Sequence, residues 1–294
     1  MDLFPELRFQ KRGRSSLWLD PGLDGGSIVD SIVDPDALFK RPECQIIKDQ
    51  RKIKVGRIPL EIGGKWTSIY LKRYNAFSWR YRVSSLFCSS GAVKSLRGAA
   101  ILSQARITTA RPLAAVECRL WGMLGESFFI SEEIEGGHTA DAYWRETLLT
   151  LEGVQGARRR GKFLQHLAQL FRSLHEQHIY HNDLKDANIL VAPGPHEGSE
   201  FFYLLDLDGI RLCRNLSRRR RIKNLVQLNR TFGRYLRRTE KLRFLRYYLG
   251  PSFSNRREKR SWITRILEQS RRWDRRSAQK ILLAGIKGKT IDGC

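Results

Sequence analysis

The 294-residue chain contains no run of about 18 apolar residues, so no segment is expected to span a membrane as a helix. Its N-terminus lacks the basic and then apolar order of a signal peptide. The five cysteines are scattered without C-x-x-C spacing, which argues against a disulfide framework and against a zinc site. These absences predict a cytoplasmic protein whose contact with a membrane is peripheral.

Acidic residues are scarce. The chain has 30 Asp and Glu against 54 Lys and Arg, which gives a net charge of +24, and its 41% of hydrophobic residues indicates a globular protein. The imbalance is greatest between Arg211 and Arg260, where 18 basic residues stand against two acids, a net charge of +16. Such a charge density requires an anionic partner, and nucleic acid, anionic lipid and phosphorylated sugar all qualify.

One short loop carries residues typical of phosphoryl transfer. The segment His181–Asn188 reads His-Asn-Asp-Leu-Lys-Asp-Ala-Asn, the catalytic-loop pattern of the protein kinases. Transfer to a hydroxyl needs a carboxylate that orients the hydroxyl or accepts its proton, and Asp183 is the candidate. Lys185 is a cation for the transferring group, and the amide oxygen of Asn188 is a candidate ligand for Mg²⁺.

A second candidate metal ligand follows an apolar strand at 201–205. This strand runs into Asp206-Leu207-Asp208-Gly209, and an aspartate at such a strand end is where these enzymes hold the metal. Asp206 directly follows the strand and is the preferred ligand. Asp208 precedes a glycine and is the alternative, since it also suits a turn.

The N-terminal half has the patterns of an extension followed by strands. Residues 1–36, rich in Gly and Asp, predict a flexible N-terminal extension. Alternating apolar residues at 53–62, a turn at Gly63-Gly64 and a second strand at 66–74 predict a hairpin. Lys72, near the end of this hairpin, is a candidate ligand for the α- and β-phosphates of a nucleotide, and the alternative is an ordinary exposed lysine. Further expected elements are a helix at 92–105, strands at 113–116 and 127–130, and a hinge at 132–137.

The C-terminal half is predicted to be helical. Apolar residues at helical spacing predict a helix at 160–177 that leads into the catalytic loop. His175 and His178 are expected to cap and pack rather than bind metal, and His181 to orient the loop through backbone hydrogen bonds. Arg218–Arg221 is a candidate docking surface for an anionic acceptor. The amphipathic segment at 260–279, with its Trp and Arg residues, is a candidate for lying on an anionic membrane.

These motifs together resemble the lipopolysaccharide core kinases, the Kdo kinase and heptose kinase group within the protein-kinase-like fold. The resemblance rests on five segments, at Tyr70–Tyr74, Ile107–Ala114, His181–Asn188, Asp206–Asp208 and Lys223–Leu249. It implies an α+β, bilobal fold with a small β-rich N-lobe at 37–131 and a larger helical C-lobe at 132–285. The C-lobe would include the basic helices, and residues 286–294 would form a C-terminal tail.

Four departures from the kinase pattern are evident. No G-x-G-x-x-G joins the first two strands, and Lys48–Lys52 occupies that turn. The helix after Lys72 carries Lys94, Ser95 and Arg97 where an acid normally pairs with the lysine. Asn182 replaces the arginine that usually precedes the catalytic aspartate, and no A-P-E closes an activation segment. Control by phosphorylation of an activation loop is therefore not expected.

The resemblance implies ATP-dependent phosphorylation of a sugar hydroxyl, of Kdo or heptose, on the lipopolysaccharide inner core. It implies ATP and Mg²⁺ as cofactors, with Mn²⁺ as the alternative metal, and an anionic glycolipid or sugar as acceptor at the inner face of the bacterial inner membrane. No specific nucleic acid is expected. Two other hypotheses stay open: a Ser/Thr-type protein kinase without an activation segment, and a degenerate kinase fold that only binds.

Overall fold

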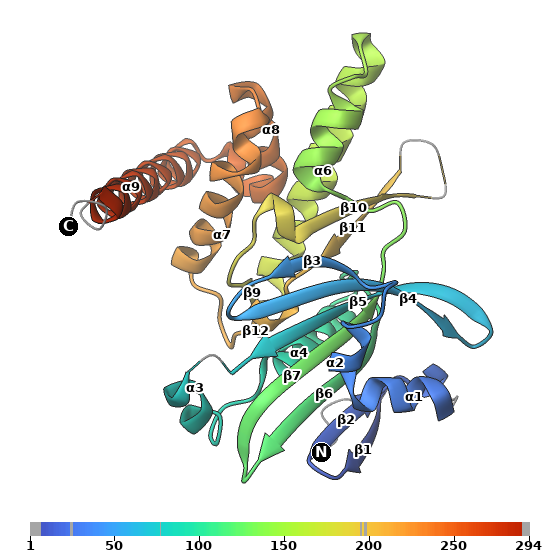
Figure 1. Cartoon of the computed structure of the whole chain (residues 1–294). Helices are drawn as coiled ribbons and strands as arrows, with labels where there is room; N and C mark the ends of the chain where they lie inside the picture. Colours follow the sequence, from blue (N-terminus) through green and yellow to red (C-terminus); the bar gives the residue numbers. More distant parts are fainter. Residues whose placement is uncertain (1–6, 24–25, 77, 195, 197–198, 290–294) are drawn as a thin grey trace. The chain divides into compact units, whose positions relative to one another are not determined.

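The computed structural model describes residues 7–23, 26–76, 78–194, 196 and 199–289, and the chain divides into two compact units. Unit 1 comprises Met1–Gly137 and Leu190–Leu212, and unit 2 comprises His138–Ile189 and Cys213–Cys294. Unit 1 is built on a large sheet and unit 2 is mostly helical (Figure 1), which confirms the predicted α+β class. The segment 190–212, which carries Asp206, belongs to the same unit as Lys72.

Unit 1 holds most of the strands. Its strands are β1 (Arg8–Arg12), β2 (Ser15–Leu19), β3 (Gln45–Asp49), β4 (Ile53–Ile62), β5 (Lys65–Asn75), β6 (Pro112–Leu120), β7 (Met123–Glu132), β10 (Ile189–Pro193), β11 (Glu200–Leu204) and β12 (Ile210–Leu212). Its helices and 3₁₀ turns are η1 (Pro21–Leu23), α1 (Gly26–Val33), α2 (Pro35–Leu38), α3 (Trp79–Ser84), α4 (Gly91–Gln104) and η4 (Leu207–Gly209).

Seven of these strands form one antiparallel sheet in the order β1-β2-β6-β7-β5-β4-β3. The predicted hairpin is confirmed as β4 and β5. Gly63 and Gly64 have φ values of +57° and +77°, the left-handed conformation that a two-residue hairpin turn requires. The β3–β4 turn lies at 50–52 and contains no glycine, so these two strands are not joined by a glycine-rich loop.

The predicted flexible extension at 1–36 is wrong for the part of it that the structure describes. β1 pairs with β2, and β2 pairs with β6, so the segment extends the sheet. Leu17 and Leu19 are fully buried because alternate residues of β2 face the core, and Leu23 and Ile32 join them. The strands of this segment are short and its turns are rich in glycine, so the alternation of buried residues was not recognised in the sequence. Residues 1–6 lie outside the described residues.

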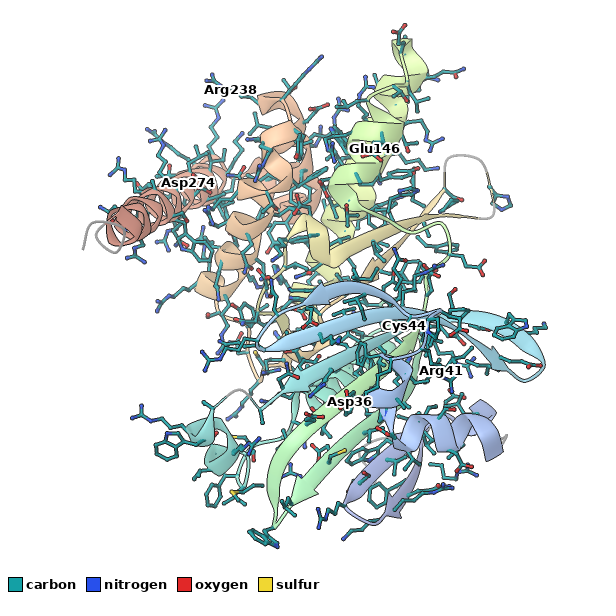
Figure 2. The ribbon with its side chains drawn as sticks, in the orientation of Figure 1. Asp36, Arg41, Cys44, Glu146, Arg238 and Asp274 are labelled. Carbon is teal, nitrogen blue, oxygen red and sulfur yellow. The ribbon has the colours of Figure 1, made fainter. Side chains whose placement is uncertain are left out.

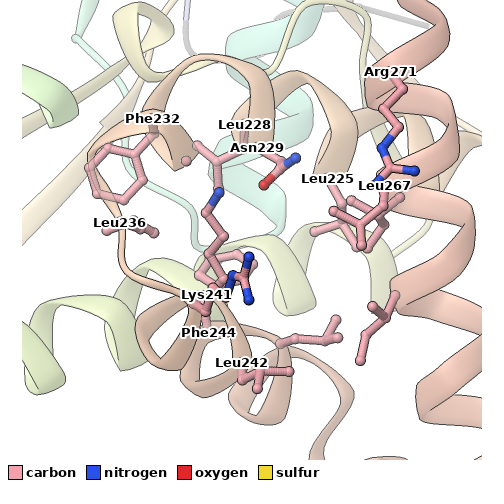
Figure 3. A pocket seen from close by; sticks show the side chains of 15 residues that line it. Leu225, Leu228, Asn229, Phe232, Leu236, Lys241, Leu242, Phe244, Leu267 and Arg271 are labelled. Carbon is pink, nitrogen blue, oxygen red and sulfur yellow. The ribbon is translucent and has the colours of Figure 1, made fainter.

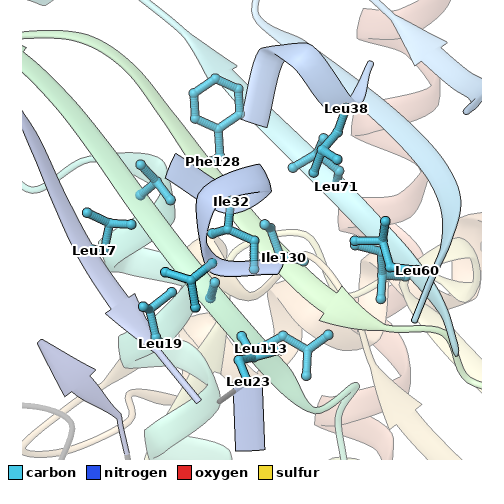
Figure 4. Packing of buried hydrophobic residues seen from close by; sticks show 14 of the residues in the cluster. Leu17, Leu19, Leu23, Ile32, Leu38, Leu60, Leu71, Leu113, Phe128 and Ile130 are labelled. Atoms are coloured by element: carbon cyan, nitrogen blue, oxygen red, sulfur yellow. The ribbon is translucent and has the colours of Figure 1, made fainter. Parts of the chain in front are cut away.

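The sheet is covered on both faces. One core cluster packs α1 and α2 against alternate sheet residues, including Ile69, Leu71, Phe128 and Ile130 (Figure 4). The neighbouring residues of β6 and β7 point the other way, where α4 packs against these two strands. Burial on both faces explains why β6 and β7 have nearly continuous apolar stretches, and it fixes α4 relative to the end of β5.

Unit 2 is helical. Its elements are β8 (His138–Thr139), α5 (Ala140–Tyr143), a π-helical turn η2 (Trp144–Leu148), α6 (Gly153–Glu176), β9 (Ile179–His181), η3 (Asp186–Asn188), α7 (Arg218–Arg230), η5 (Phe232–Tyr235), α8 (Arg238–Leu249), η6 (Gly250–Ser254) and α9 (Arg256–Lys289).

The core of unit 2 is aromatic and lies on α6. Trp144, Phe163 and Phe232 are fully buried, with ring centroids 5.4 to 6.1 Å apart. Burying such rings stabilises the unit by about 2 kcal/mol each from area alone. The predicted helix at 160–177 is thus confirmed as part of α6, and it ends two residues before β9. The predicted tail at 286–294 begins inside α9, and residues 290–294 lie outside the described chain. None of the helices within the described ranges has the length and apolarity needed to cross a membrane.

Candidate active site

In unit 2 the catalytic loop brings Asp183, Lys185 and Asn188 together. Lys185 Nζ lies 2.7 Å from Asp183 Oδ2, and Asn188 Nδ2 donates to the backbone oxygen of Asp183 at 2.7 Å. Asn188 is thereby oriented with its amide nitrogen toward the loop, and no described residue donates to its Oδ1. The Asp183 carboxylate is about two-fifths exposed, so a substrate hydroxyl has access to it.

His181 orients the loop from inside, as the sequence predicts. Its ring is buried, and its Nδ1 accepts a hydrogen bond from the Asp183 backbone N–H at 3.1 Å. An imidazole nitrogen that accepts a hydrogen bond carries no proton, so this bond requires the neutral ring with its hydrogen on Nε2. His181 therefore holds the backbone of Asp183 rather than acting as a base.

Two buried amides of α7 hold the same loop and were missed in the sequence. Gln227 Nε2 donates to the Asn182 oxygen at 2.8 Å, and its Oε1 accepts from Leu184 N at 3.3 Å. Asn224 Nδ2 donates to the His181 oxygen at 2.6 Å and to Gln227 Oε1 at 2.8 Å. The signal was present: two amides spaced three apart on a helix face otherwise made of Ile, Leu and Val.

The network continues away from the loop through His175. Asn224 Oδ1 lies 3.2 Å from His175 Nε2, and His175 Nδ1 lies 2.8 Å from the Tyr248 hydroxyl. Burial lowers the pKa of His175 to about 4, while the bond to Asn224 opposes this shift and the charge of Arg221 adds to it. His175 is therefore a neutral packing residue at neutral pH, consistent with its predicted role, and it links α6, α7 and α8.

In unit 1, Lys72 pairs with two aspartates. Its Nζ lies 2.5 Å from Asp206 Oδ1 and 3.1 Å from Asp208 Oδ1. Burial disfavours the charge on Lys72, but the interactions of its ammonium with Tyr74, Asp208 and Asp206 outweigh burial and raise the pKa of Lys72. Burial raises the pKa of Asp208, and Asp206 adds to this while Lys72 opposes it. Lys72 is thus a charged side chain held at a pair of carboxylates, not an ordinary exposed lysine.

Two hydroxyl groups, of Tyr74 and Ser95, lie on the side of α4 where the protein kinases have an acid that pairs with the lysine. The Tyr74 hydroxyl donates to Asp208 Oδ1 at 3.1 Å and lies 2.7 Å from Ser95 Oγ on α4. Each hydroxyl has one hydrogen, so Tyr74 donates to Asp208 only while Ser95 donates to Tyr74 and not to the Gly91 oxygen, its other acceptor at 3.0 Å. Gly91 permits this approach, because a Cβ there would lie 2.4 Å from the Tyr74 ring. The missing helix acid is therefore replaced by Asp208, tied to α4 through Tyr74 and Ser95.

The segment that carries these aspartates is fixed on both sides. Thr109 Oγ1 donates to the Leu204 oxygen at 2.7 Å, and Leu204 N donates to the Thr108 oxygen at 3.1 Å, which fixes the end of β11. On the other side Gly98 lets α4 lie against η4, since a Cβ there would lie 2.2 Å from the Leu207 oxygen. Asp206 itself has φ +58° and ψ +52°, a left-handed conformation that is strained for a residue with a Cβ and is common at functional sites.

The two predicted metal ligands, Asp206 in unit 1 and Asn188 in unit 2, each carry oxygen donors of the kind that a hard divalent cation prefers. Mg²⁺ prefers carboxylate and amide oxygens, and the predicted ligands Asp206 and Asn188 supply both kinds. Neither a softer nitrogen- and sulfur-containing site nor any cluster of three or more His, Cys, Asp or Glu side chains arranged for a metal occurs among the residues that the structure describes. The chemistry of these side chains therefore suits Mg²⁺ shared with a phosphate ligand better than an all-protein metal site.

Most of the arginines in the run Arg218–Arg221 make contacts within unit 2. Arg218 lies over the Trp262 ring with its guanidinium carbon 4.7 Å from the centroid, and Arg221 donates to the His175 oxygen at 3.0 Å. Arg220 lies over the Tyr180 ring at 5.4 Å. Three of the four arginines therefore contact the neighbours of α7, and the expectation that this run attracts an anionic acceptor stays a prediction.

Unit 2 also contains an apolar cavity of about 510 Å³ between α7, η5, α8 and α9 (Figure 3). Leucine and phenylalanine side chains form most of its wall, and Leu242 and Leu267 are its partly exposed members. Arg238, Lys241 and Arg271 also line it. An apolar interior with cationic side chains beside it suits an acyl chain attached to an anionic head group.

Comparison with known proteins identifies the family. The model of the lipopolysaccharide kinase (Kdo/WaaP) family matches residues 64–248. A solved structure of WaaP in complex with acyl carrier protein has a TM-score of 0.64 to this chain at 17% identity, and the alignment covers 87% of this chain and 98% of that chain. No curated protein sequence matches the chain.

The structural similarity confirms the predicted kinase-like fold. The family match includes Lys72, the catalytic loop and Asp206, and it extends through the two amides of α7. Since it spans well over half of the chain, we conclude that the chain belongs to the lipopolysaccharide kinase (Kdo/WaaP) family and is a kinase.

Proposed function

We propose that the chain transfers the γ-phosphoryl group of ATP to a hydroxyl of Kdo or heptose in the lipopolysaccharide inner core. The observation that supports this most directly is the catalytic loop, in which Asp183 is accessible while the backbone of Asn182–Leu184 is held by His181, Asn188 and Gln227. A carboxylate on a fixed backbone is what orientation of an acceptor hydroxyl requires.

In the proposed reaction the sugar hydroxyl oxygen attacks the γ-phosphorus. A new P–O bond forms, the bond to the β-phosphate oxygen breaks, and ADP leaves. Asp183 accepts the proton of the hydroxyl. Lys185, whose ammonium lies 2.7 Å from Asp183, stabilises negative charge on the transferring group.

Lys72 is proposed to bind the α- and β-phosphates, and Asn188 and Asp206 are the proposed ligands of Mg²⁺. When bound, the metal neutralises the charge that develops on the phosphate oxygens. Asp208, 3.1 Å from the Lys72 ammonium, would remain its partner if Asp206 held the metal. Activity is therefore expected to require a divalent cation.

An acyl-bearing glycolipid is the proposed acceptor, at the inner face of the bacterial inner membrane. The apolar cavity of unit 2 supports this choice over a protein acceptor, because a peptide acceptor carries no acyl chain that would occupy the cavity. The similar WaaP structure was obtained with acyl carrier protein, a second possible source of an acyl chain for this cavity.

Parallel transfer assays test the proposal. Labelled ATP and Mg²⁺ are supplied with a lipid A–Kdo acceptor, with a heptose-containing inner core and with a generic protein. Label in a glycolipid, lost in Asp183→Ala, supports the proposal. Label in protein alone would identify a protein kinase, and label in none of them, with ATP still bound, would identify a binding module.

A further inference from the structure

Large apolar side chains are exposed on α3, on the turn after it and on the β6–β7 turn of unit 1. Figure 1 shows these elements, and α3 contacts β7. We call these side chains the aromatic patch; its members are Trp79, Val83, Leu86, Phe87, Leu120 and Trp121. Phe87 is 89% exposed, Trp121 87% and Trp79 71%. Single exposed apolar residues are ordinary on a protein surface, whereas a group of this size marks an interaction surface.

The two parts of the patch are joined by hydrogen bonds. Ser85 Oγ accepts from Leu124 N at 2.9 Å, and Arg119 Nη1 donates to the Ser85 oxygen at 3.1 Å and to the Gly122 oxygen at 2.8 Å. Leu86 lies against the β6–β7 turn, since a Cβ on Gly122 would be 3.3 Å from it. The exposed rings therefore belong to one fixed surface rather than to two unrelated loops.

The β6–β7 turn holds a tryptophan in a backbone conformation that is strained for this residue. Trp121 and Gly122 have φ values of +50° and +78°, a turn whose first position favours Asn, Asp or Gly. A tryptophan at positive φ is strained, and in this turn its side chain is almost entirely exposed. Neither the backbone conformation of the turn nor packing within the chain favours a tryptophan at this position. We therefore attribute it to contact with a partner outside the chain.

The sequence of α3 and of the segment after it has one sign of charge, whereas two acids near the β6–β7 turn are paired with arginines, Glu117 with Arg119 and Glu126 with Arg73. From Ala76 to Val116 there are six Lys or Arg and no Asp or Glu. Arg80 and Arg82 are exposed beside the patch, and Arg80 lies over the Trp79 ring at 5.6 Å. Aromatic rings favour the boundary between lipid head groups and acyl chains, and arginines beside them pair with lipid phosphates.

The C-terminal helix is a weaker candidate for this contact than the sequence indicated. Trp262 is buried beneath Arg218, and Trp273 lies 5.2 Å from the guanidinium of Arg230. Both tryptophans of the segment 260–279 therefore pack against α7. Residues 256–279 of α9 include nine Lys or Arg against three acids, one of which is Asp274 (Figure 2), so the outer face of this part of the helix is mainly basic.

We propose that the aromatic patch docks unit 1 on an anionic phospholipid bilayer, with Trp79, Phe87 and Trp121 entering the interface and Arg80 and Arg82 at lipid phosphates. The biological purpose of this contact rests on the proposed function, because a glycolipid acceptor resides in such a bilayer. The docking itself requires neither ATP nor the acceptor, and it is therefore measurable when the proposed function fails.

Vesicle flotation with the full-length chain tests the proposal. The triple variant Trp79→Ser, Phe87→Ser, Trp121→Ser is compared with the wild type and with Trp66→Ser, a matched control because Trp66 is 75% exposed beside the β4–β5 turn. The vesicles contain phosphatidylcholine with phosphatidylglycerol, or phosphatidylcholine alone, and no lipopolysaccharide. Thermal unfolding checks that each variant is folded.

Measurements at high salt distinguish membrane binding through the aromatic patch from binding through the basic helices. At about 0.5 M salt the Debye length is about 4 Å, so attraction through exposed arginines is largely screened while apolar insertion persists. We expect the triple variant to lose at least about tenfold in partition coefficient on the anionic vesicles at high salt, from the apolar area no longer inserted. Trp66→Ser should stay within about twofold of the wild type.

Two results would overturn the proposal. One is an equal partition coefficient for the triple variant and the control, which would assign all membrane attraction to the basic helices. The other is an absence of vesicle binding together with self-association of the wild type that the triple variant loses. That outcome would make the patch a contact between protein molecules.

Discussion

Lys72 Nζ lies 3.1 Å from Asp208 Oδ1, although the two residues are 136 positions apart in the chain. In protein kinases an acid of the helix after this lysine normally holds it. Here α4 provides Ser95, and the carboxylate comes from the loop after β11. The customary ion pair is thus replaced by an aspartate that a tyrosine and a serine connect to the helix.

Replacing Asp208 with Asn removes a charge from this arrangement while keeping its shape. We expect Asp208→Asn to raise the KM for ATP and to lower kcat/KM by roughly 10- to 100-fold, the usual range for a hydrogen bond to a charged group. Tyr74→Phe should have a smaller effect in the same direction. Steady-state kinetics with varied ATP checks both, and wild-type kinetics in Asp208→Asn would refute the assigned role.

Gln227 is expected to affect turnover rather than nucleotide binding. Gln227→Ala removes the bonds to Asn182 O and Leu184 N, so Asp183 loses part of its fixed position. The expected result is a fall of about 10- to 100-fold in kcat with a KM for ATP within about threefold of the wild type. Gln169→Ala, an exposed change on α6, is the control. A rise in the KM for ATP alone would contradict this role.

His175 makes stability depend on pH. Its pKa is about 4 in the folded protein against an ordinary 6.5, so the unfolded chain binds the proton first as pH falls. Stability therefore decreases between pH 6.5 and pH 4, by about 2 kcal/mol between pH 7 and pH 5 from this group. Urea unfolding should show this loss in the wild type and less of it in His175→Gln. His196→Gln, at an exposed position, should behave as the wild type.

The cavity in unit 2 predicts a dependence on acyl chains. Leu242→Gln and Leu267→Gln place polar groups at two partly exposed positions of its wall. We expect the double variant to raise the KM for an acylated acceptor about tenfold, from lost apolar contact. The KM for a deacylated acceptor should be unchanged. Equal effects on both acceptors would show that the cavity does not bind the acyl chain.

Residues whose chemistry depends on local spacing could be predicted from the sequence. The pattern from His181 to Asn188 predicted a loop whose Asp183, Lys185 and Asn188 side chains the structure brings together. The position of Asp206 after an apolar strand predicted a metal ligand, and its contact with Lys72 emerged only from the structure. The β4–β5 hairpin was predictable because a two-residue glycine turn fixes its register. In each of these cases the signal lies within a few residues.

Contacts that join distant segments could not be predicted in this way. The role of Asp208 depends on Tyr74 and Ser95, and nothing in the local sequence distinguishes it from a turn residue. The first 36 residues appeared to be an extension because β2 becomes a strand only by pairing with β6, about 100 residues later. Arg218–Arg221 was predicted as a docking surface, and its contacts with Trp262 and Tyr180 could not be predicted because the sequence does not reveal which arginines lie over aromatic rings.

The central claim is that Asp183 promotes phosphoryl transfer to a sugar hydroxyl of lipopolysaccharide. The most direct measurement is transfer of label from ATP to a Kdo- or heptose-bearing inner-core acceptor, with Asp183→Asn as the matched variant. The account predicts labelled glycolipid with the wild type and a rate lower by at least about 1,000-fold in Asp183→Asn, at similar affinity for ATP. Equal labelling by the two proteins would contradict it.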